Sequence, residues 1–129
     1  PGGSERVRYI GVDTPESVKP NTPVQCYAKA ASHLNAQLVG GKTVTLTPGP
    51  EARDRYGRLL AYVTTETGVD VNAALLKAGA ARTLSIPPNT DRAPEFADLE
   101  VKARNQQVGL WGVCGYAQNK GYPLVGSNH

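Results

Sequence analysis

Short apolar runs alternate with polar connections rich in glycine and proline along the whole chain. Residues 7–12 (VRYIGV) and 59–66 (LLAYVTTE) are rich in β-branched and aromatic residues, which predicts a strand at each. Residues 42–47 (KTVTLT) alternate with period two and predict another strand, which should end at a turn over Pro48-Gly49-Pro50.

Three other segments carry apolar residues at helical spacing. A first helix is predicted from Tyr27 to the Gly40-Gly41 pair. A shorter helix is predicted over about residues 71–78, with Asp70 or Asn72 as its N-cap. A third helix should begin near Pro94, because proline is tolerated in the first turn, and should end at Gly109.

These elements mix strands and helices without a β-α-β rhythm, so the predicted class is α+β. The 129 residues suit one domain, which we place at residues 1–115, with an irregular tail over 116–129. No apolar run approaches the roughly 18 residues of a membrane span, so no membrane association is expected. The net charge of +3 permits a nucleic-acid partner but does not by itself indicate one.

The two cysteines, Cys26 and Cys114, are far apart in the sequence and form no CxxC motif, which disfavours a thiolate metal site. One disulfide is the natural interpretation if the protein is exported, and two buried thiols are the alternative. The spacing alone leaves both open. With a disulfide, we expect a secreted or periplasmic protein.

Possible catalytic charge is concentrated in two segments, VRYIGVDTPE (residues 7–16) and DRYGR (residues 54–58). Guanidinium groups bind phosphate oxygens in a bidentate manner and stay charged at any working pH. Carboxylate and carbonyl oxygens are the ligands that calcium prefers, and a nearby glutamate can act as a general base. Taken separately, each segment also fits an ordinary strand-end turn with surface arginines.

Together these segments resemble the staphylococcal nuclease (thermonuclease) family. The resemblance rests on VRYIGVDTPE, a Cys-Tyr-Ala helix start, DRYGRLLAYV, NAALLKAGAA and GLW, in that order over residues 7–112. It implies an OB-fold-type five-stranded β-barrel with three α-helices. It also implies calcium-dependent hydrolysis of DNA and RNA to products with a 3′-phosphate.

The resemblance assigns roles to individual residues. Asp13 would be a carboxylate ligand of the calcium ion, and Thr14 would add its backbone carbonyl. Glu16 would orient or deprotonate the attacking water, while Arg8 and Arg58 would grip the scissile phosphate from two sides.

Three further residues are candidates for substrate binding. Tyr56 could stack on a base or pack beside the site, and Arg55 and Lys19 could contact phosphates or remain solvated. One departure from the family concerns Thr83-Leu84-Ser85-Ile86, where relatives often have tyrosines that flank the nucleotide. Base stacking at these positions should therefore be lost.

The family order also places two strands, with another calcium-binding aspartate, before VRYIGVDTPE, and the residues that precede this segment here, PGGSER, show neither. We therefore expect the barrel to lack its first two strands. We also expect a separate segment or another chain to supply them, for example by strand exchange. The alternative function is a nuclease-fold module, weakly active or inactive, that binds nucleic acid or protein.

Overall fold

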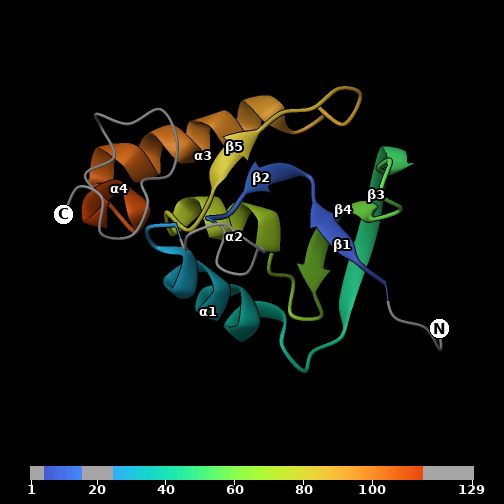
Figure 1. Cartoon of the computed structure of the whole chain (residues 1–129), viewed down its shortest axis with the longest axis horizontal. Helices are drawn as coiled ribbons and strands as arrows, with labels where there is room; N and C mark the ends of the chain where they lie inside the picture. The colour runs from blue at the N-terminus through green and yellow to red at the C-terminus, as the bar shows by residue number, and fades with distance from the viewer. Residues whose placement is uncertain (1–4, 16–24, 115–129) are drawn as a thin grey trace.

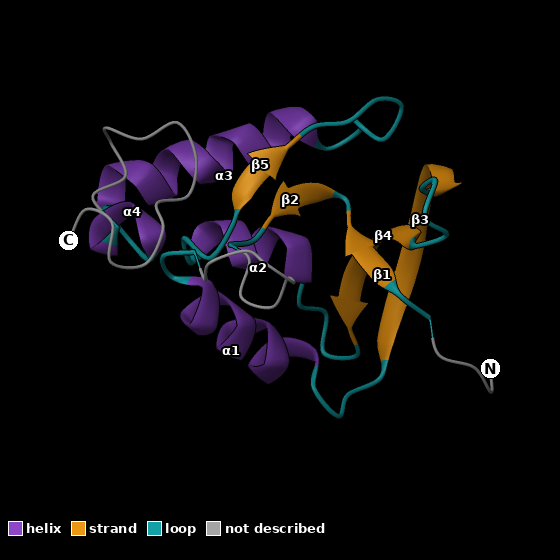
Figure 2. Cartoon of the chain, viewed as in Figure 1, coloured by secondary structure: helices purple, strands orange, loops and turns teal. Residues whose placement is uncertain are grey.

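The computed structural model describes residues 5–15 and 25–114. Along these residues the chain forms five strands and four helices (Figures 1 and 2). In chain order they are β1 (Val7–Tyr9), β2 (Gly11–Asp13), α1 (Ala28–Val39), β3 (Val44–Arg53), β4 (Leu59–Thr65), α2 (Val71–Lys77), β5 (Arg82–Leu84), α3 (Ala93–Gln106) and α4 (Leu110–Val113).

The strands form two sheets. One has the order β1-β4-β3, with β1 parallel and β3 antiparallel to β4, and the other pairs β2 with β5 in antiparallel fashion. The α+β class is thus confirmed. Over the described residues, however, the strands do not close into the five-stranded barrel that the resemblance implies.

The predicted strand over residues 7–12 is in fact two strands. The backbone turns at Ile10, and Gly11 adopts a positive φ of 80°, a conformation that glycine tolerates best. A Cβ at Gly11 would lie 2.6 Å from the ring of Phe96, so the close approach of α3 also requires glycine. As a result β1 pairs with β4, while β2 pairs with β5 beside α3 (Figure 1).

The predicted turn at Pro48-Gly49-Pro50 is wrong, because β3 continues through these residues to Arg53. The pairing with β4 shifts register between Pro48 and Arg53. β3 lies at the edge of its sheet, where prolines without an N–H are tolerated. Next to the prolines, the Asn89 side chain accepts a hydrogen bond from the Glu51 N–H and donates one to the Glu51 carbonyl.

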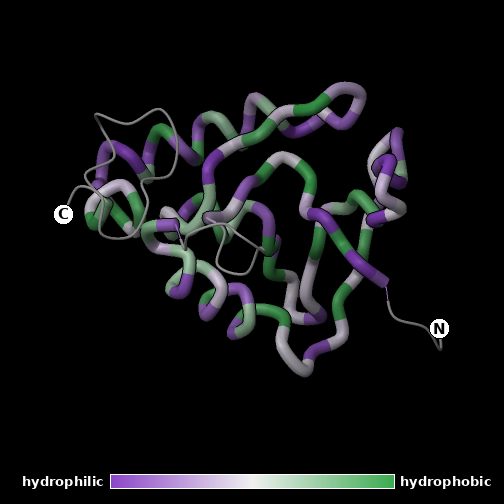
Figure 3. Tube along the Cα trace, viewed as in Figure 1, coloured by the Kyte–Doolittle hydropathy of each residue, from purple (hydrophilic) through white to green (hydrophobic). Residues whose placement is uncertain are grey.

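All three predicted helices are present, and α4 is a fourth that the sequence pattern did not predict. The Asp70 side chain caps α2 by accepting a hydrogen bond from the N–H of Ala73, whereas Asn72 is buried inside the helix. Along α1, hydrophobic and hydrophilic residues are interspersed within each turn, as in an amphipathic helix with one apolar face (Figure 3).

The core is centred on α2, which contacts α1, α3, β4 and β2 (Figure 1). Its Leu75 and Leu76 are fully buried, and Phe96 of α3 packs into the same cluster. A second cluster surrounds Trp111, as expected of a packing anchor, and includes Cys26 and Cys114. The sulfur atoms of these two cysteines lie 2.07 Å apart, at disulfide distance.

Candidate active site

A pocket of about 500 Å³ opens where β1, the start of β4, and the segment after β5 meet. The charged side chains that line it are Arg8, Glu51, Asp54, Arg55 and Arg58, and its apolar walls include Ile10, Leu60, Leu84 and Ile86. Three guanidinium groups and two carboxylates give the pocket lining a net positive charge, which favours an anionic ligand.

The Asp54–Arg58 loop, which joins β3 to β4, is organised around one carboxylate. Oδ1 of Asp54 accepts hydrogen bonds from the N–H groups of Tyr56 and Arg58, both at 2.9 Å. Oδ2 accepts one from Nε of Arg58 at 2.6 Å. The Gly57 N–H donates to the Asp54 carbonyl, and Gly57 has a φ of 81°, which suits glycine. Asp54 therefore fixes both the turn and the direction of the Arg58 side chain.

The electrostatics of Asp54 follow from these contacts. Desolvation alone would raise its pKa, but the hydrogen bonds from Arg58 and from the Tyr56 backbone outweigh that effect and hold the pKa below its usual value. The carboxylate consequently stays ionised, and its charge-assisted bond to Arg58 persists, well below neutral pH.

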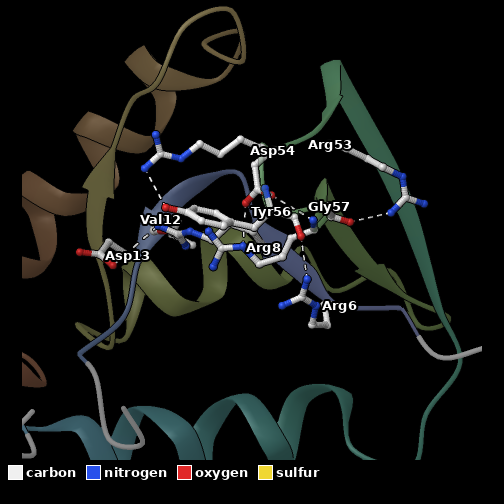
Figure 4. A network of polar contacts seen from close by, with 10 residues as sticks. Arg6, Arg8, Val12, Asp13, Arg53, Asp54, Tyr56 and Gly57 are labelled. Atoms are coloured by element: carbon white, nitrogen blue, oxygen red, sulfur yellow. Dashed lines mark hydrogen bonds and ion pairs between the residues drawn. The ribbon is translucent and has the colours of Figure 1, made fainter. Parts of the chain in front are cut away.

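Arg8 connects the two short strands of the first segment. Its Nη1 donates to the Val12 carbonyl at 2.9 Å, and its Nη2 lies 3.7 Å from Oδ1 of Asp13 (Figure 4). The side chain is 27% exposed, so it still faces the pocket and solvent. The structure thus brings Arg8, from β1, to the same pocket as Arg58.

Tyr56 and Arg55 lie against each other at the pocket wall. Arg55 donates to the Tyr56 hydroxyl at 2.7 Å, and its guanidinium lies 4.9 Å from the ring centroid. The Arg58 guanidinium lies 5.6 Å from the same centroid. The Tyr56 side chain remains exposed. In this arrangement the tyrosine supports two arginines.

Leu84 and Ile86 form the aliphatic part of the wall and are both partly exposed. They belong to residues 83–86, the segment in which the resemblance led us to expect a loss of base stacking. The structure shows that this segment does line the pocket. An aliphatic surface can cover a base but lacks the π-face of an aromatic ring.

Two predicted site residues, Glu16 and Lys19, lie outside the described residues. Asp13 ends β2, and its side chain is 42% exposed. Thr14 follows directly in the chain. Within residues 5–15 and 25–114 no group of three or more His, Cys, Asp or Glu side chains is placed to hold a metal. Because calcium takes six to eight oxygen ligands, the two ligands that the resemblance implies, Asp13 and the Thr14 carbonyl, would not complete such a site by themselves.

The role of Asp54 was not predicted, although the residue begins the DRYGR motif. The signal was available: aspartate commonly accepts hydrogen bonds from the backbone just after it in a turn, and Asp54 lies four residues before Arg58. Leu60 and Asn89 were also missed as pocket residues, because only the fold brings them to Arg8.

Comparison with known proteins identifies the family. Residues 6–113 match the model of the staphylococcal nuclease homologue family. The chain is 44% identical to the thermonuclease of Staphylococcus intermedius over 110 residues, which cover 85% of this chain and 65% of that protein. It is 42% identical to endonuclease YncB of Bacillus subtilis (strain 168) over 123 residues, 94% of this chain and 58% of the relative.

The chain thus spans less than two thirds of the length of these relatives. None of the helices in the described part of the chain has the length and apolar character to cross a bilayer. The matched range includes both charged segments of the pocket, and the resemblance seen in the sequence is confirmed. The chain belongs to the staphylococcal nuclease homologue family, whose domain has an OB-type fold.

Proposed function

We propose that this protein is a nuclease that hydrolyses phosphodiester bonds of DNA and RNA, with calcium as cofactor, and leaves 3′-phosphate products. The observation that carries the proposal is that Arg8 and Arg58 line the same open pocket, whose lining has a net positive charge. The names of the relatives, a thermonuclease and an endonuclease, support the same reaction class.

The arginines act on the phosphate. A phosphodiester gathers negative charge on its phosphoryl oxygens in the transition state, and preorganised guanidinium groups stabilise that charge. Arg58 is held by Asp54 before substrate arrives, and Arg8 is held by the Val12 carbonyl. The scissile phosphate therefore binds between two oriented guanidinium groups with little reorganisation.

The remaining roles concern the water and the cation. Glu16 is the proposed general base or orienting group for the attacking water, three residues beyond Asp13. Asp13 and the Thr14 carbonyl are the proposed protein ligands of calcium, and other oxygens must complete its shell. When bound, the ion neutralises phosphate charge and acidifies a bound water.

Substrate contacts and compartment are part of the same proposal. Arg55 binds a neighbouring phosphate, Tyr56 supports Arg55, and Lys19 contacts the backbone of the nucleic acid. The cysteine pair at disulfide distance supports a secreted or periplasmic location. The open sheets of the described residues are compatible with strands supplied by another segment or chain, which stays a prediction.

A module that binds nucleic acid or protein without cutting is the second candidate. The aliphatic wall at Leu84 and Ile86 and the partial calcium ligand set favour it. Incubating the purified protein with end-labelled DNA and RNA, in calcium and in chelator, separates the two functions. We expect cleavage in calcium only. The mobility of the products on a gel should change after a phosphatase removes their 3′-phosphates. Binding by fluorescence anisotropy without any cleavage would support the binding module instead.

A further inference from the structure

The backbone of the Asp54–Arg58 loop is held from outside by two arginines that do not line the pocket. Arg6, just before β1, donates from Nη2 to the Tyr56 carbonyl at 2.7 Å. Arg53, at the end of β3, donates from Nη1 to the Gly57 carbonyl at 2.8 Å. Figure 4 shows the two side chains reaching the loop from different segments, one just before β1 and the other at the end of β3.

Each of these arginines is itself fixed. The Arg53 guanidinium forms a two-pronged contact with Glu5, with distances of 2.7 Å from Nη1 to Oε1 and 3.1 Å from Nη2 to Oε2. Such a fork restricts the rotation of a guanidinium group. The Arg6 carbonyl accepts the N–H of Leu59 at 2.8 Å, so Arg6 contacts the chain on both sides of Arg58.

The position of the loop matters because Arg58 is carried by it. A shift of about 1 Å in a catalytic group can cost on the order of a hundred-fold in rate. The turn contains a glycine with positive φ, and glycine has more backbone freedom than any other residue. External hydrogen bonds to the Tyr56 and Gly57 carbonyls restrict the backbone at the two residues that directly precede Arg58.

We propose that Arg6 and Arg53 are positioning residues, which clamp the carbonyls of Tyr56 and Gly57 and so fix Arg58 where it stabilises the transition-state charge on the phosphate. Glu5 acts one step further out by orienting Arg53. This inference rests on the proposed nuclease function. It gives a role to Glu5, Arg6 and Arg53, three charged residues that lie outside both sequence motifs and do not line the pocket.

The competing role for an arginine near a nucleic-acid site is direct contact with a phosphate. Loss of such a contact weakens binding for every sequence and lowers the salt dependence of the affinity. Loss of a clamp instead lowers the cleavage rate at saturating substrate and leaves affinity and salt dependence unchanged. Rate and affinity measured on the same variants therefore separate the two roles.

The test uses Arg6→Met and Arg53→Met, which remove the donors but keep an unbranched stem. Lys102→Met, an exposed cation on α3, is the matched control for loss of charge. We expect the single-turnover rate to fall on the order of ten-fold in each arginine variant. The dissociation constant for DNA and its salt slope should match those of the control. A reduced salt slope with an unchanged saturated rate would overturn the clamp.

The pair Glu5→Arg with Arg53→Glu sharpens the test. It can restore an ion pair between positions 5 and 53, but a glutamate at position 53 cannot donate to the Gly57 carbonyl. The clamp predicts that activity stays low in this double variant even where thermal stability recovers. Full recovery of the rate would show that only the ion pair matters and would contradict the clamp.

An activity-independent measurement keeps the inference separate from the proposed function. The N–H groups of Tyr56, Gly57 and Arg58 are all bonded to Asp54. Hydrogen exchange at these amides should accelerate in Arg6→Met and Arg53→Met, and not in Lys102→Met. Unchanged exchange would refute the clamp even in a protein that cleaves DNA. Absence of cleavage by the unmodified protein would refute the nuclease proposal, and exchange would still decide the clamp.

Discussion

The Asp54 carboxylate accepts a hydrogen bond from the backbone N–H of Arg58 and another from the Nε of the same residue. One acidic side chain thus fixes both the backbone and the guanidinium direction of an arginine that faces the pocket. A carboxylate bound to an arginine usually offsets its charge and occupies N–H donors that another anion would use. Here the contact uses Nε, and the guanidinium carries further N–H donors on its Nη groups for a phosphate.

Asp54→Asn should lower the rate of cleavage on the order of ten-fold, because an amide cannot replace the charge-assisted contact with Arg58. The Asn Oδ1 can still accept the backbone hydrogen bonds from Tyr56 and Arg58, so the fold should survive. Single-turnover cleavage by the variant and circular dichroism measure the two effects. A rate equal to that of the unmodified protein would show that Arg58 does not depend on Asp54.

The pH dependence of stability tests the same contact. The pKa of Asp54 is lowered in the folded protein, so its ionised form contributes stability above the unfolded-state pKa, and that stability is lost as pH falls through the folded value. The stability difference between the unmodified protein and Asp54→Asn should be constant near neutral pH and should shrink below about pH 4. Urea unfolding across this range measures it, and a difference that grows on acidification would contradict the assignment.

Much of the site was predictable because its residues lie in two short motifs. Arg8 and four of the five residues of the DRYGR motif line one pocket, and Asp13 lies 3.7 Å from Arg8, whereas the roles of these residues stay predictions. The break at Gly11 was not predictable from local pattern, because it depends on the approach of Phe96 from a helix more than eighty residues away. The continuation of β3 through Pro48 was missed because local turn preferences do not include an edge strand's tolerance of proline.

Glu16→Gln should lower turnover much more than it weakens calcium or DNA binding, because the amide keeps the shape of the side chain but cannot accept a proton. Rates at saturating DNA, together with calcium titration by calorimetry, provide the comparison. Equal losses in binding and turnover would argue against a general-base role for Glu16.

Asn72 makes the most specific prediction about stability. Its fully buried side chain accepts the Val63 N–H at 2.9 Å and donates to the Ile10 carbonyl at 2.8 Å, where β1 gives way to β2. Asn72→Ala should destabilise the protein by roughly 2–4 kcal/mol, because both backbone groups lose a buried partner. Asn105→Ala, at an exposed position of α3, is the control and should change stability by less than about 0.5 kcal/mol. Similar unfolding midpoints in urea for the two variants would contradict this role.

Cys26 and Cys114, which are 88 residues apart in the sequence, should form a disulfide in protein purified without reductant. Replacing both with alanine should cost about 2–5 kcal/mol of stability. Thiol labelling of the denatured, unreduced protein gives the direct answer. Two labelled thiols per chain would refute the bond and would remove the main support for a secreted or periplasmic location.

The central claim is that the pocket between Arg8 and Arg58 is where a phosphodiester bond is cleaved. The most direct test is the single-turnover rate of DNA cleavage in calcium by the purified protein and by its Arg8→Lys and Arg58→Lys variants. Lysine keeps the charge but loses the planar fork, so we expect each rate to fall about a hundred-fold or more while the fold is retained. If both variants cleave DNA at nearly the unmodified rate, this pocket is not the catalytic site.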